Sequence, residues 1–547
     1  MRLFRCLLPL VLVTLVGLLG SHLTGFAPAA APAVGALTRP AEPITPTTRT
    51  ADQIAEEIKS FYPHSRLHEP ADQLKELIVH PDFEVTLFAS SPWVMNPIAM
   101  AWDAQHRLWV INSPMYPQVL PGQRHMDFIS VLEDTDGDGR ADRCTIFYDQ
   151  LYVPTGLALG DGGVYVANQP DLLFLKDSQG GLRADTRRIF LSGFGTEDNH
   201  HAISAFRWGP GGWLYFMSGV FLHSQIETPH GLVRLQDGGT FQLRPRNQKL
   251  SLYNVGTATN PWGLAFDRWG QAFLTEGPQG GIWHLNPGHI HGNPSERTPE
   301  TGAPKACGNE FIEGPHWRPE YQGAMVLNGF KNKTVNLYQF SDDGAGFATR
   351  EVQPLLIQSN EPYFRPVDVK VGPDGAVYVA DFFQELIGHM QYEFRDPRRD
   401  HVNGRIWRVT QKGSAPLKRP AFAQQSLDEL CQNLAAPDAY VRDISRRVLY
   451  DRSAREAAAV AEAIHRFVAG LDVQAPGFEH HRLEALWAQQ TIERVDLGLL
   501  RQVLESPEPR ARAAACVVLR DLLEQVPEAT DWLARRVADE HPRVRME

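Results

Sequence analysis

The 547-residue sequence has little cysteine and no surplus of positive charge. It contains five cysteines and neither a CxxC nor a CxxCH motif, which excludes a disulfide-dense scaffold, a zinc ribbon and a covalently attached haem. Asp and Glu number 64 against 53 for Lys and Arg, so the net charge of −11 provides no field that would attract a phosphate backbone. We therefore expect no nucleic acid partner.

Long apolar runs are also missing beyond the N-terminus. Two arginines precede the uncharged residues 6–19, and small Ala and Pro residues follow, which is the arrangement of a secretory signal. We assign residues 1–27 to a signal peptide or, because the uncharged stretch continues to Ala36, to an N-terminal membrane anchor. The protein is therefore expected to be exported, and to be periplasmic or anchored so that it faces the periplasm. Residues 28–78 form a Pro/Ala-rich linker and a lead-in helix predicted over 51–80.

The segment 79–412 repeats one pattern, and consecutive copies begin about 50 residues apart. Each copy has a polar corner, alternating apolar residues, a turn with Gly and an aromatic strand. The copies begin at Asn96, Val153, Ala202, Asn260, Gly314 and Arg365. One four-stranded sheet per copy, closed radially so that few sheet edges are exposed, predicts a mostly β fold, a six-bladed β-propeller. A β-sandwich is the alternative, and we expect the last strand, 404–410, to complete the first or last blade.

From residue 420 to residue 547 the pattern becomes helical. Two copies of an L-x-x-L helix, a Pro-Asp or Pro-Glu turn and a second helix with V/A-R-x-x-A/S are similar to HEAT repeats. The propeller is therefore predicted to be followed by an α-helical HEAT-repeat (armadillo-type) solenoid, whose surface would suit a protein partner. A third copy begins at Asp531 and stops within its second helix, so we expect a truncated array.

An acidic loop, E-D-T-D-G-D-G-R-A-D, resembles the start of a calcium loop. Its oxygen ligands would come from Asp134, Asp136, Asp138 and Asp142, and Gly139 would allow the sharp turn. The terminal Glu of an EF-hand loop is missing, because Thr145 stands in its place. We expect a structural calcium site here; the alternative is a plain acidic turn.

Two adjacent histidines precede the third copy of the repeat, in the segment D-N-H-H-A. Neighbouring side chains of an extended loop point in different directions, so one of His200 and His201 should face the central funnel. A neutral imidazole there could take a proton from a substrate hydroxyl. The alternative is a pair of metal ligands or a hydrogen bond that fixes the loop.

As a whole, the sequence resembles the membrane-bound dehydrogenases of planctomycete-type bacteria, which join a propeller to HEAT repeats. The motifs that carry this resemblance are D-N-H-H-A, N-P-W-G-L-A-F-D-R-W-G, the acidic loop and R-D-P-R-R-D-H-V-N-G-R-I-W-R-V-T. It is more distantly similar to the soluble quinoprotein glucose and sorbosone dehydrogenases, six-bladed propellers that hold pyrroloquinoline quinone (PQQ) and Ca²⁺.

The second resemblance implies individual roles. His201 matches the general base, Asn260 matches a residue beside PQQ, Lys331 matches the lysine on the quinone, and Arg365 matches an arginine on a PQQ carboxylate. The carbonyl groups of Gly277 and Pro278 match the ligands of a funnel calcium ion. Thr259 and Val367 stand where those enzymes have two further PQQ-binding arginines.

The implied function is that of an exported oxidoreductase that oxidises a C–OH group of a sugar or alcohol by hydride transfer to PQQ, assisted by calcium. Because no CxxCH motif occurs, electrons would leave through a separate acceptor such as a cytochrome. Two other interpretations are open. The chain is a non-catalytic propeller/HEAT binding scaffold, or it is a calcium-dependent, lactonase-type hydrolase.

Overall fold

The computed structural model describes residues 40–256, 259–277, 280–286, 295–297, 305–386, 388 and 392–547. The predicted signal peptide or anchor, 1–27, and the predicted calcium ligand Pro278 lie outside the described residues. None of the helices within the described ranges is both long enough and apolar enough to cross a lipid bilayer.

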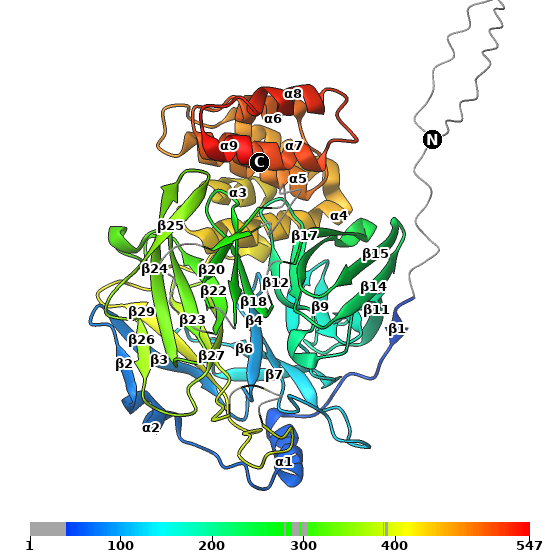
Figure 1. Cartoon of the computed structure of the whole chain (residues 1–547), viewed down its shortest axis with the longest axis vertical. Coiled ribbons are helices and arrows are strands. Elements are labelled where there is room, and N and C mark those ends of the chain that lie inside the picture. The colour runs from blue at the N-terminus through cyan, green and yellow to red at the C-terminus, as the bar shows by residue number, and fades with distance from the viewer. Residues whose placement is uncertain are drawn as a thin grey trace, which may run out of the picture. The chain divides into compact units, whose positions relative to one another are not determined.

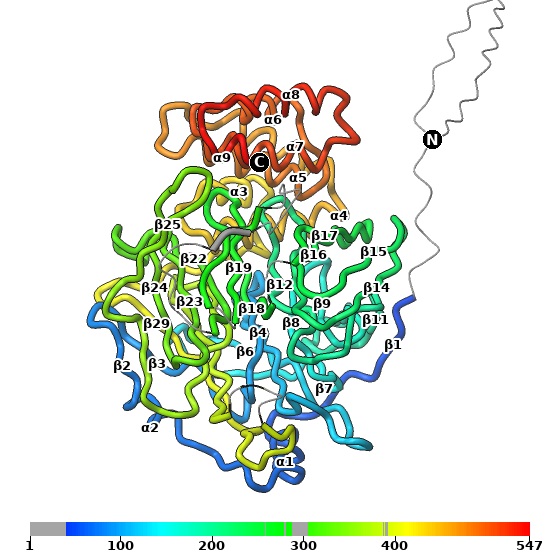
Figure 2. Tube along the Cα trace, in the orientation of Figure 1, coloured from blue at the N-terminus to red at the C-terminus, as the bar shows by residue number. Residues whose placement is uncertain are grey.

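Six antiparallel sheets form the first part of the described structure (Figures 1 and 2). From the innermost strand outward, the first three are β4 (Pro97–Trp102), β5 (Leu108–Asn112), β6 (Asp127–Glu133) and β7 (Arg143–Leu151); β8 (Gly156–Gly160), β9 (Gly163–Asn168), β10 (Asp171–Lys176) and β11 (Thr186–Ser192); and β12 (Ser204–Trp208), β13 (Leu214–Ser218), β16 (Gly239–Arg244) and β17 (Lys249–Val255). The hairpin β14 (His223–Thr228) and β15 (Gly231–Gln236) is an insertion in the third sheet.

The other three sheets follow the same order. They are β18 (Pro261–Phe266), β19 (Ala272–Glu276), β20 (Ile282–Leu285) and β21 (Ser295–Arg297); β22 (Ala306–Ile312), β23 (Ala324–Gly329) and β24 (Thr334–Asp343), with β25 (Gly346–Glu351) and β26 (Ile357–Ser359) both paired to β24; and β27 (Pro366–Val371), β28 (Val377–Asp381), β29 (Arg405–Gln411) and β3 (Phe83–Ser90).

The innermost strands close a ring. Each of β4, β8, β12, β18, β22 and β27 contacts the next, and β27 contacts β4. The last sheet is completed by β3, which pairs with β29 from Ser90 opposite Arg405 to Phe83 opposite Gln411. The predicted six-bladed β-propeller is therefore confirmed, and the strand predicted over 404–410 belongs to the last blade, next to the N-terminal strand.

The fifth blade begins earlier than its sequence pattern suggested. Its innermost strand is β22, whereas Gly314, where we placed the start of the fifth copy, lies in the connection between β22 and β23. The prediction was wrong because A-C-G-N-E-F-I has neither the Pro-containing corner nor the Gly turn by which the other copies were recognised.

The lead-in segment is only partly helical. It forms α1 (Ala51–Phe61), α2 (Pro70–Lys75) and the strand β2 (Leu77–Val79), which pairs with β26 at the edge of blade 5. Thr50 caps α1 in a capping box, and Ile54 and Ile58 are fully buried. Part of the predicted linker is also ordered, because the short strand β1 (Glu42–Pro43) pairs with β11.

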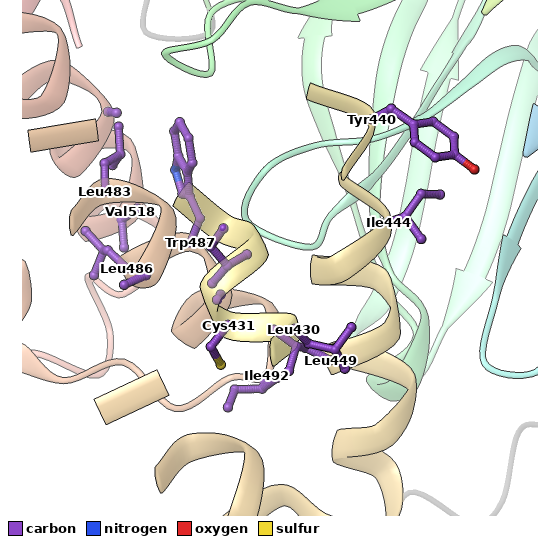
Figure 3. Packing of buried hydrophobic residues seen from close by; sticks show 14 of the residues in the cluster. Leu430, Cys431, Tyr440, Ile444, Leu449, Leu483, Leu486, Trp487, Ile492 and Val518 are labelled. Atoms are coloured by element: carbon purple, nitrogen blue, oxygen red, sulfur yellow. The ribbon is translucent and has the colours of Figure 1, made fainter. Parts of the chain in front are cut away.

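A helical region follows the propeller and covers one of its ends (Figure 1). It consists of α3 (Leu427–Gln432), α4 (Ala439–Ala469), α5 (Phe478–Thr491), α6 (Leu497–Leu504), α7 (Pro509–Asp521), α8 (Ala529–Arg536) and α9 (Pro542–Met546). Figure 3 shows Leu430 and Trp487 packed inside this region, while Tyr440 and Ile444 of α4 point toward the propeller. These residues share one hydrophobic core with Trp102 of blade 1 and other propeller residues.

Three helix pairs of this region share one contact. An arginine near the start of each second helix donates hydrogen bonds to two carbonyl groups of the turn before it. Arg442 in α4 donates to Ala436 and Pro437, Arg512 in α7 to Ser506 and Pro507, and Arg545 in α9 to Asp539 and Glu540. The pairs α3–α4, α6–α7 and α8–α9 are thus structurally equivalent at their turns.

Candidate functional site

The ring of inner strands encloses a cavity on the propeller axis. Its volume is about 160 Å³, and every blade contributes to its wall. One residue from each inner strand represents this wall: Met100, Leu157, Phe206, Trp262, Cys307 and Val367. We call the end at which the inner strands begin the mouth.

The helical region covers the opposite end of the channel, and a second cavity of about 130 Å³ lies between α4 and the inner strands. There Arg207 of β12 and Glu310 of β22 form a bidentate ion pair, with both N–O distances 2.6 Å. Asp443 of α4 lies 4.0 Å from the same guanidinium group.

Asp198 orders the two histidines. It precedes a single 3₁₀ turn, Asn199–His201, and its Oδ1 accepts a hydrogen bond of 2.9 Å from the amide of His200. The turn sends the two imidazoles in different directions. His200 borders the cavity, and its Nδ1 is 2.8 Å from the hydroxyl of Tyr116.

His201 is the more deeply buried of the pair, with 5% of its surface exposed. Its Nε2 contacts the side-chain amide of Asn260, and its Nδ1 lies 3.4 Å from Oδ2 of Asp198. In the neutral tautomer with its proton on Nδ1, facing the carboxylate, Nε2 would accept a hydrogen bond from that amide. This is the state in which an imidazole can accept a proton.

Two glycines allow this close arrangement. A Cβ on Gly219 would lie 2.9 Å from Cδ2 of His201 and 2.8 Å from the carbonyl oxygen of Thr259. A Cβ on Gly277 would lie 3.1 Å from Cβ of Asn260, whose carbonyl accepts the Gly277 amide at 2.9 Å. Only a residue without a side chain fits beneath the His201 ring.

Phe221 forms a further wall beside His201, and sequence reasoning missed it. The two rings lie 5.5 Å apart, and 59% of Phe221 is exposed. Its φ of 73° is in the left-handed region, which is uncommon for a bulky side chain. The Phe221 amide donates a 3.0 Å hydrogen bond to the side chain of Asp237, which directly follows the inserted hairpin. This bond holds the backbone in place.

The residues predicted to bind a cofactor gather at the same mouth. Trp262 lies 4.8 Å from the His200 ring and 6.1 Å from the Phe330 ring. Phe330 in turn lies 5.8 Å from the guanidinium carbon of Arg365, and the exposed Lys331 follows Phe330 in the chain. These two aromatic rings thus lie between His200 and Arg365, and Lys331 is adjacent to Phe330 in the sequence.

Arg365 is mostly occupied by the protein itself. It donates hydrogen bonds to the carbonyl groups of Phe364 and Glu385, whereas its buried Nε has no acceptor among the described residues. Burial lowers the pKa of the guanidinium, and the carboxylate of Asp381 opposes this effect.

The acidic loop lies at the helical end, far from the histidines along the strands. Oxygen atoms of Asp134, Asp136 and Asp138 lie within 4.8 Å of one another, whereas Asp142 turns away and accepts hydrogen bonds from Thr135. Asp134 is 2.5 Å from the guanidinium group of Arg419, in the segment that leads to the helices. The positive charge that we expected from calcium is thus supplied to Asp134 by an arginine.

Sequence reasoning also missed Tyr116 and Arg419. Each acts through a contact between segments that lie far apart in the chain, and neither stands in a motif. The signal that could have identified Phe221 is its position, two residues after a glycine at the end of an aromatic strand.

A family model covers the propeller. It is described as a domain of unknown function, DUF7133, and it matches residues 69–303 and 292–413, which is more than half of the chain. The chain belongs to the DUF7133 family. The DUF7133 match includes His201, Asn260, Lys331 and Arg365, and it ends before the helical region. No curated protein sequence matches the chain.

Solved structures resemble the DUF7133 propeller weakly. An oxidoreductase (glucose dehydrogenase) from Thermus thermophilus is 18% identical, with 60% of this chain and 99% of that chain covered and a TM-score of 0.41. The PQQ-bound aldose sugar dehydrogenase from Streptomyces coelicolor is 15% identical, with 61% and 100% covered and a TM-score of 0.37. A gluconolactonase is 13% identical, with 65% and 99% covered and a TM-score of 0.36. The assignment of the fold rests on the closed ring of six sheets and not on these scores.

Proposed function

We propose that this DUF7133 protein is an oxidoreductase that oxidises a C–OH group of a small sugar or alcohol at the propeller mouth. One observation carries the proposal: a buried imidazole, His201, has its Nε2 against the Asn260 amide and its Nδ1 3.4 Å from Asp198, beside His200, which borders the axial cavity. A general base needs such a lone pair within reach of a bound hydroxyl.

The protein's part of the reaction follows from this geometry. The substrate hydroxyl replaces the Asn260 amide at Nε2 of His201 and gives up its proton to that nitrogen. The imidazolium that forms is stabilised by the Asp198 carboxylate on the opposite side of the ring. The two electrons of the C–H bond leave with the hydrogen, so the carbon becomes a carbonyl.

PQQ is the electron acceptor that we propose, and the residues at the mouth fit it in kind. A flat quinone with carboxylates needs an aromatic surface and cationic groups. Trp262 and Phe330 supply the aromatic surface. Lys331 and Arg365 supply the cationic groups, and Nε of Arg365 has no acceptor among the described residues. When bound, the quinone would take up the hydride that leaves the substrate carbon.

Calcium, export and the reaction partners belong to the same proposal. A calcium ion would help to polarise the acceptor at the mouth, where Gly277 is the described one of the two predicted ligands. Electrons would pass to a separate carrier, and the equivalent helix turns of the C-terminal region support HEAT-like repeats as the surface for a protein partner.

A titration tests the proposal. Purified chain is titrated with PQQ in the presence of Ca²⁺ while the quinone absorbance is followed, and then sugars and alcohols are added with an artificial dye acceptor. Saturable PQQ binding and substrate-dependent dye reduction are the expected results. If PQQ does not bind, or if no substrate reduces the dye, the proposal fails, and hydrolysis of lactones is the next activity to assay.

A further inference from the structure

The cavity behind His200 has a lining that is more apolar than polar. Its wall includes Met100, Leu157, Phe206, Val367 and Phe382. These side chains come from four different blades, so the cavity is a property of the closed ring and not of one loop.

The polar groups that border this cavity have partners within the protein. The Thr155 hydroxyl donates to the carbonyl of Ile203 at 2.7 Å, and the Tyr116 hydroxyl lies 2.8 Å from His200. Asp368 accepts a hydrogen bond of 2.7 Å from the Met100 amide and pairs with Lys370 at 2.6 Å. A buried water molecule requires two to four polar partners, and the wall offers few.

The size of the cavity limits what can fill it. Its volume of about 160 Å³ is close to that of an apolar cavity that binds benzene, about 150 Å³. It is smaller than the usual pocket for a whole ligand, which is roughly 300–1,000 Å³. The cavity therefore suits one compact part of a molecule.

The reacting group would lie next to this part. The rings of His200 and His201 are 5.2 Å apart, and His200 borders the cavity. His200 is thus the neighbour that His201 and the cavity share.

We infer that the axial cavity binds a compact apolar group of the substrate, about as large as a benzene ring. This inference rests on the proposed function and narrows its substrate class: the substrate is an alcohol with an apolar ring beside the reacting carbon, and not a free sugar. Hydrophobic burial in the channel orients the molecule while His201 acts on the hydroxyl.

The test is a binding measurement that needs no cofactor and no turnover. Benzyl alcohol and myo-inositol are titrated into the full chain and followed by calorimetry and by tryptophan fluorescence, since Trp262 borders the cavity. Two variants fill the cavity from β4, Ala99→Leu and the bulkier Ala99→Phe. Ala71→Phe, on the exposed surface of α2, adds the same side chain elsewhere.

We expect benzyl alcohol to bind to the wild type and to Ala71→Phe alike, and at least tenfold more weakly to both Ala99 variants. Myo-inositol should not compete. The inference is overturned if benzyl alcohol does not bind, if filling the cavity leaves its affinity unchanged, or if myo-inositol binds equally well. Should benzyl alcohol bind in the cavity while no alcohol reduces the dye, the proposed function fails and the inference about the ligand stands.

Discussion

The side-chain amide of Asn260, at the start of blade 4, contacts Nε2 of His201, at the start of blade 3. Two blades thus contribute the two halves of one contact, and its geometry depends on how the blades pack. In the proposed reaction, a substrate hydroxyl would take the place of this amide at Nε2. This relationship makes His201, and not its neighbour His200, the residue to change first.

Replacing His201 with Ala should lower kcat at least hundredfold, because general base catalysis typically contributes a factor of about 10²–10⁴. PQQ binding should change little, since His201 is not among the cationic or aromatic residues at the mouth. Stopped-flow reduction of the dye measures the first quantity and absorbance titration the second. His223→Ala is the control. This histidine lies on the nearby β14–β15 hairpin, its side chain is 57% exposed, and it pairs with Glu197. Equal activity of the two variants would contradict the role of His201.

Gly219→Ala should impair activity without unfolding the protein. The added methyl group would lie 2.9 Å from Cδ2 of His201, so the ring must shift and lose its contact with Asn260. We expect kcat to fall about tenfold or more, and the melting temperature to fall as well, because the methyl group would also lie 2.8 Å from the carbonyl oxygen of Thr259. Gly181→Ala has open space around its Cβ and serves as the matched control. Unchanged activity of Gly219→Ala would show that the position of His201 is not critical.

The helical region should be joined to the propeller by a buried ion network. Arg442 of α4 lies 2.6 Å from Glu313, in the β22–β23 connection, and 3.1 Å from Glu484 of α5. Arg442→Met removes this cation, but Arg446 still pairs with Glu484 and Arg268 with Glu313. The loss of unfolding free energy should therefore be below the roughly 3–5 kcal/mol expected for an uncompensated buried charge. Urea denaturation measures it. The exposed pair of Arg466 and Asp428 is the comparison. Arg466→Met should leave the midpoint of the urea transition unchanged.

The contribution of Asp267 to the stability of the protein should fall as the pH rises from about 4 to 7. Burial raises the pKa of Asp267 to about 7, whereas the unfolded value is about 3.9. The folded state therefore binds the extra proton in this window, and ionisation favours unfolding by about 1 kcal/mol per pH unit. Asp267→Asn keeps the oxygen that accepts the amides of Trp269 and Gln271, and it removes the titration. Its melting temperature should depend less on pH than that of the exposed control Asp343→Asn. Parallel pH profiles would contradict this assignment.

Calcium should raise the melting temperature modestly through the acidic loop. Asp136 and Asp138 are exposed there and lie within 4.8 Å of Asp134. Differential scanning fluorimetry with Ca²⁺ and with EGTA measures the effect, and Asp136→Asn should abolish it. No shift of the wild-type melting temperature would contradict a calcium site in this loop.

The repeat pattern was sufficient to predict the number of blades, because alternating apolar residues and Gly turns are local features of the sequence. It failed at blade 5, where β22 has no such corner. The residues predicted for the site do gather at one mouth, since equivalent positions of successive blades meet around the axis. The contacts of Tyr116 with His200 and of Arg419 with Asp134 join segments that are far apart in the sequence. No local sequence pattern predicts such contacts.

The pairing of β3 with β29 determines when the propeller can close as the chain is synthesised. Ser90 finds its partner only when Arg405 has been made, so more than half of the chain must emerge before the first strand of the propeller can pair. Until then one edge of the sixth sheet is missing and the ring is open. A nascent chain that is to fold correctly must keep these edges from pairing with other molecules, and any truncation before residue 405 removes the strand that seals the ring.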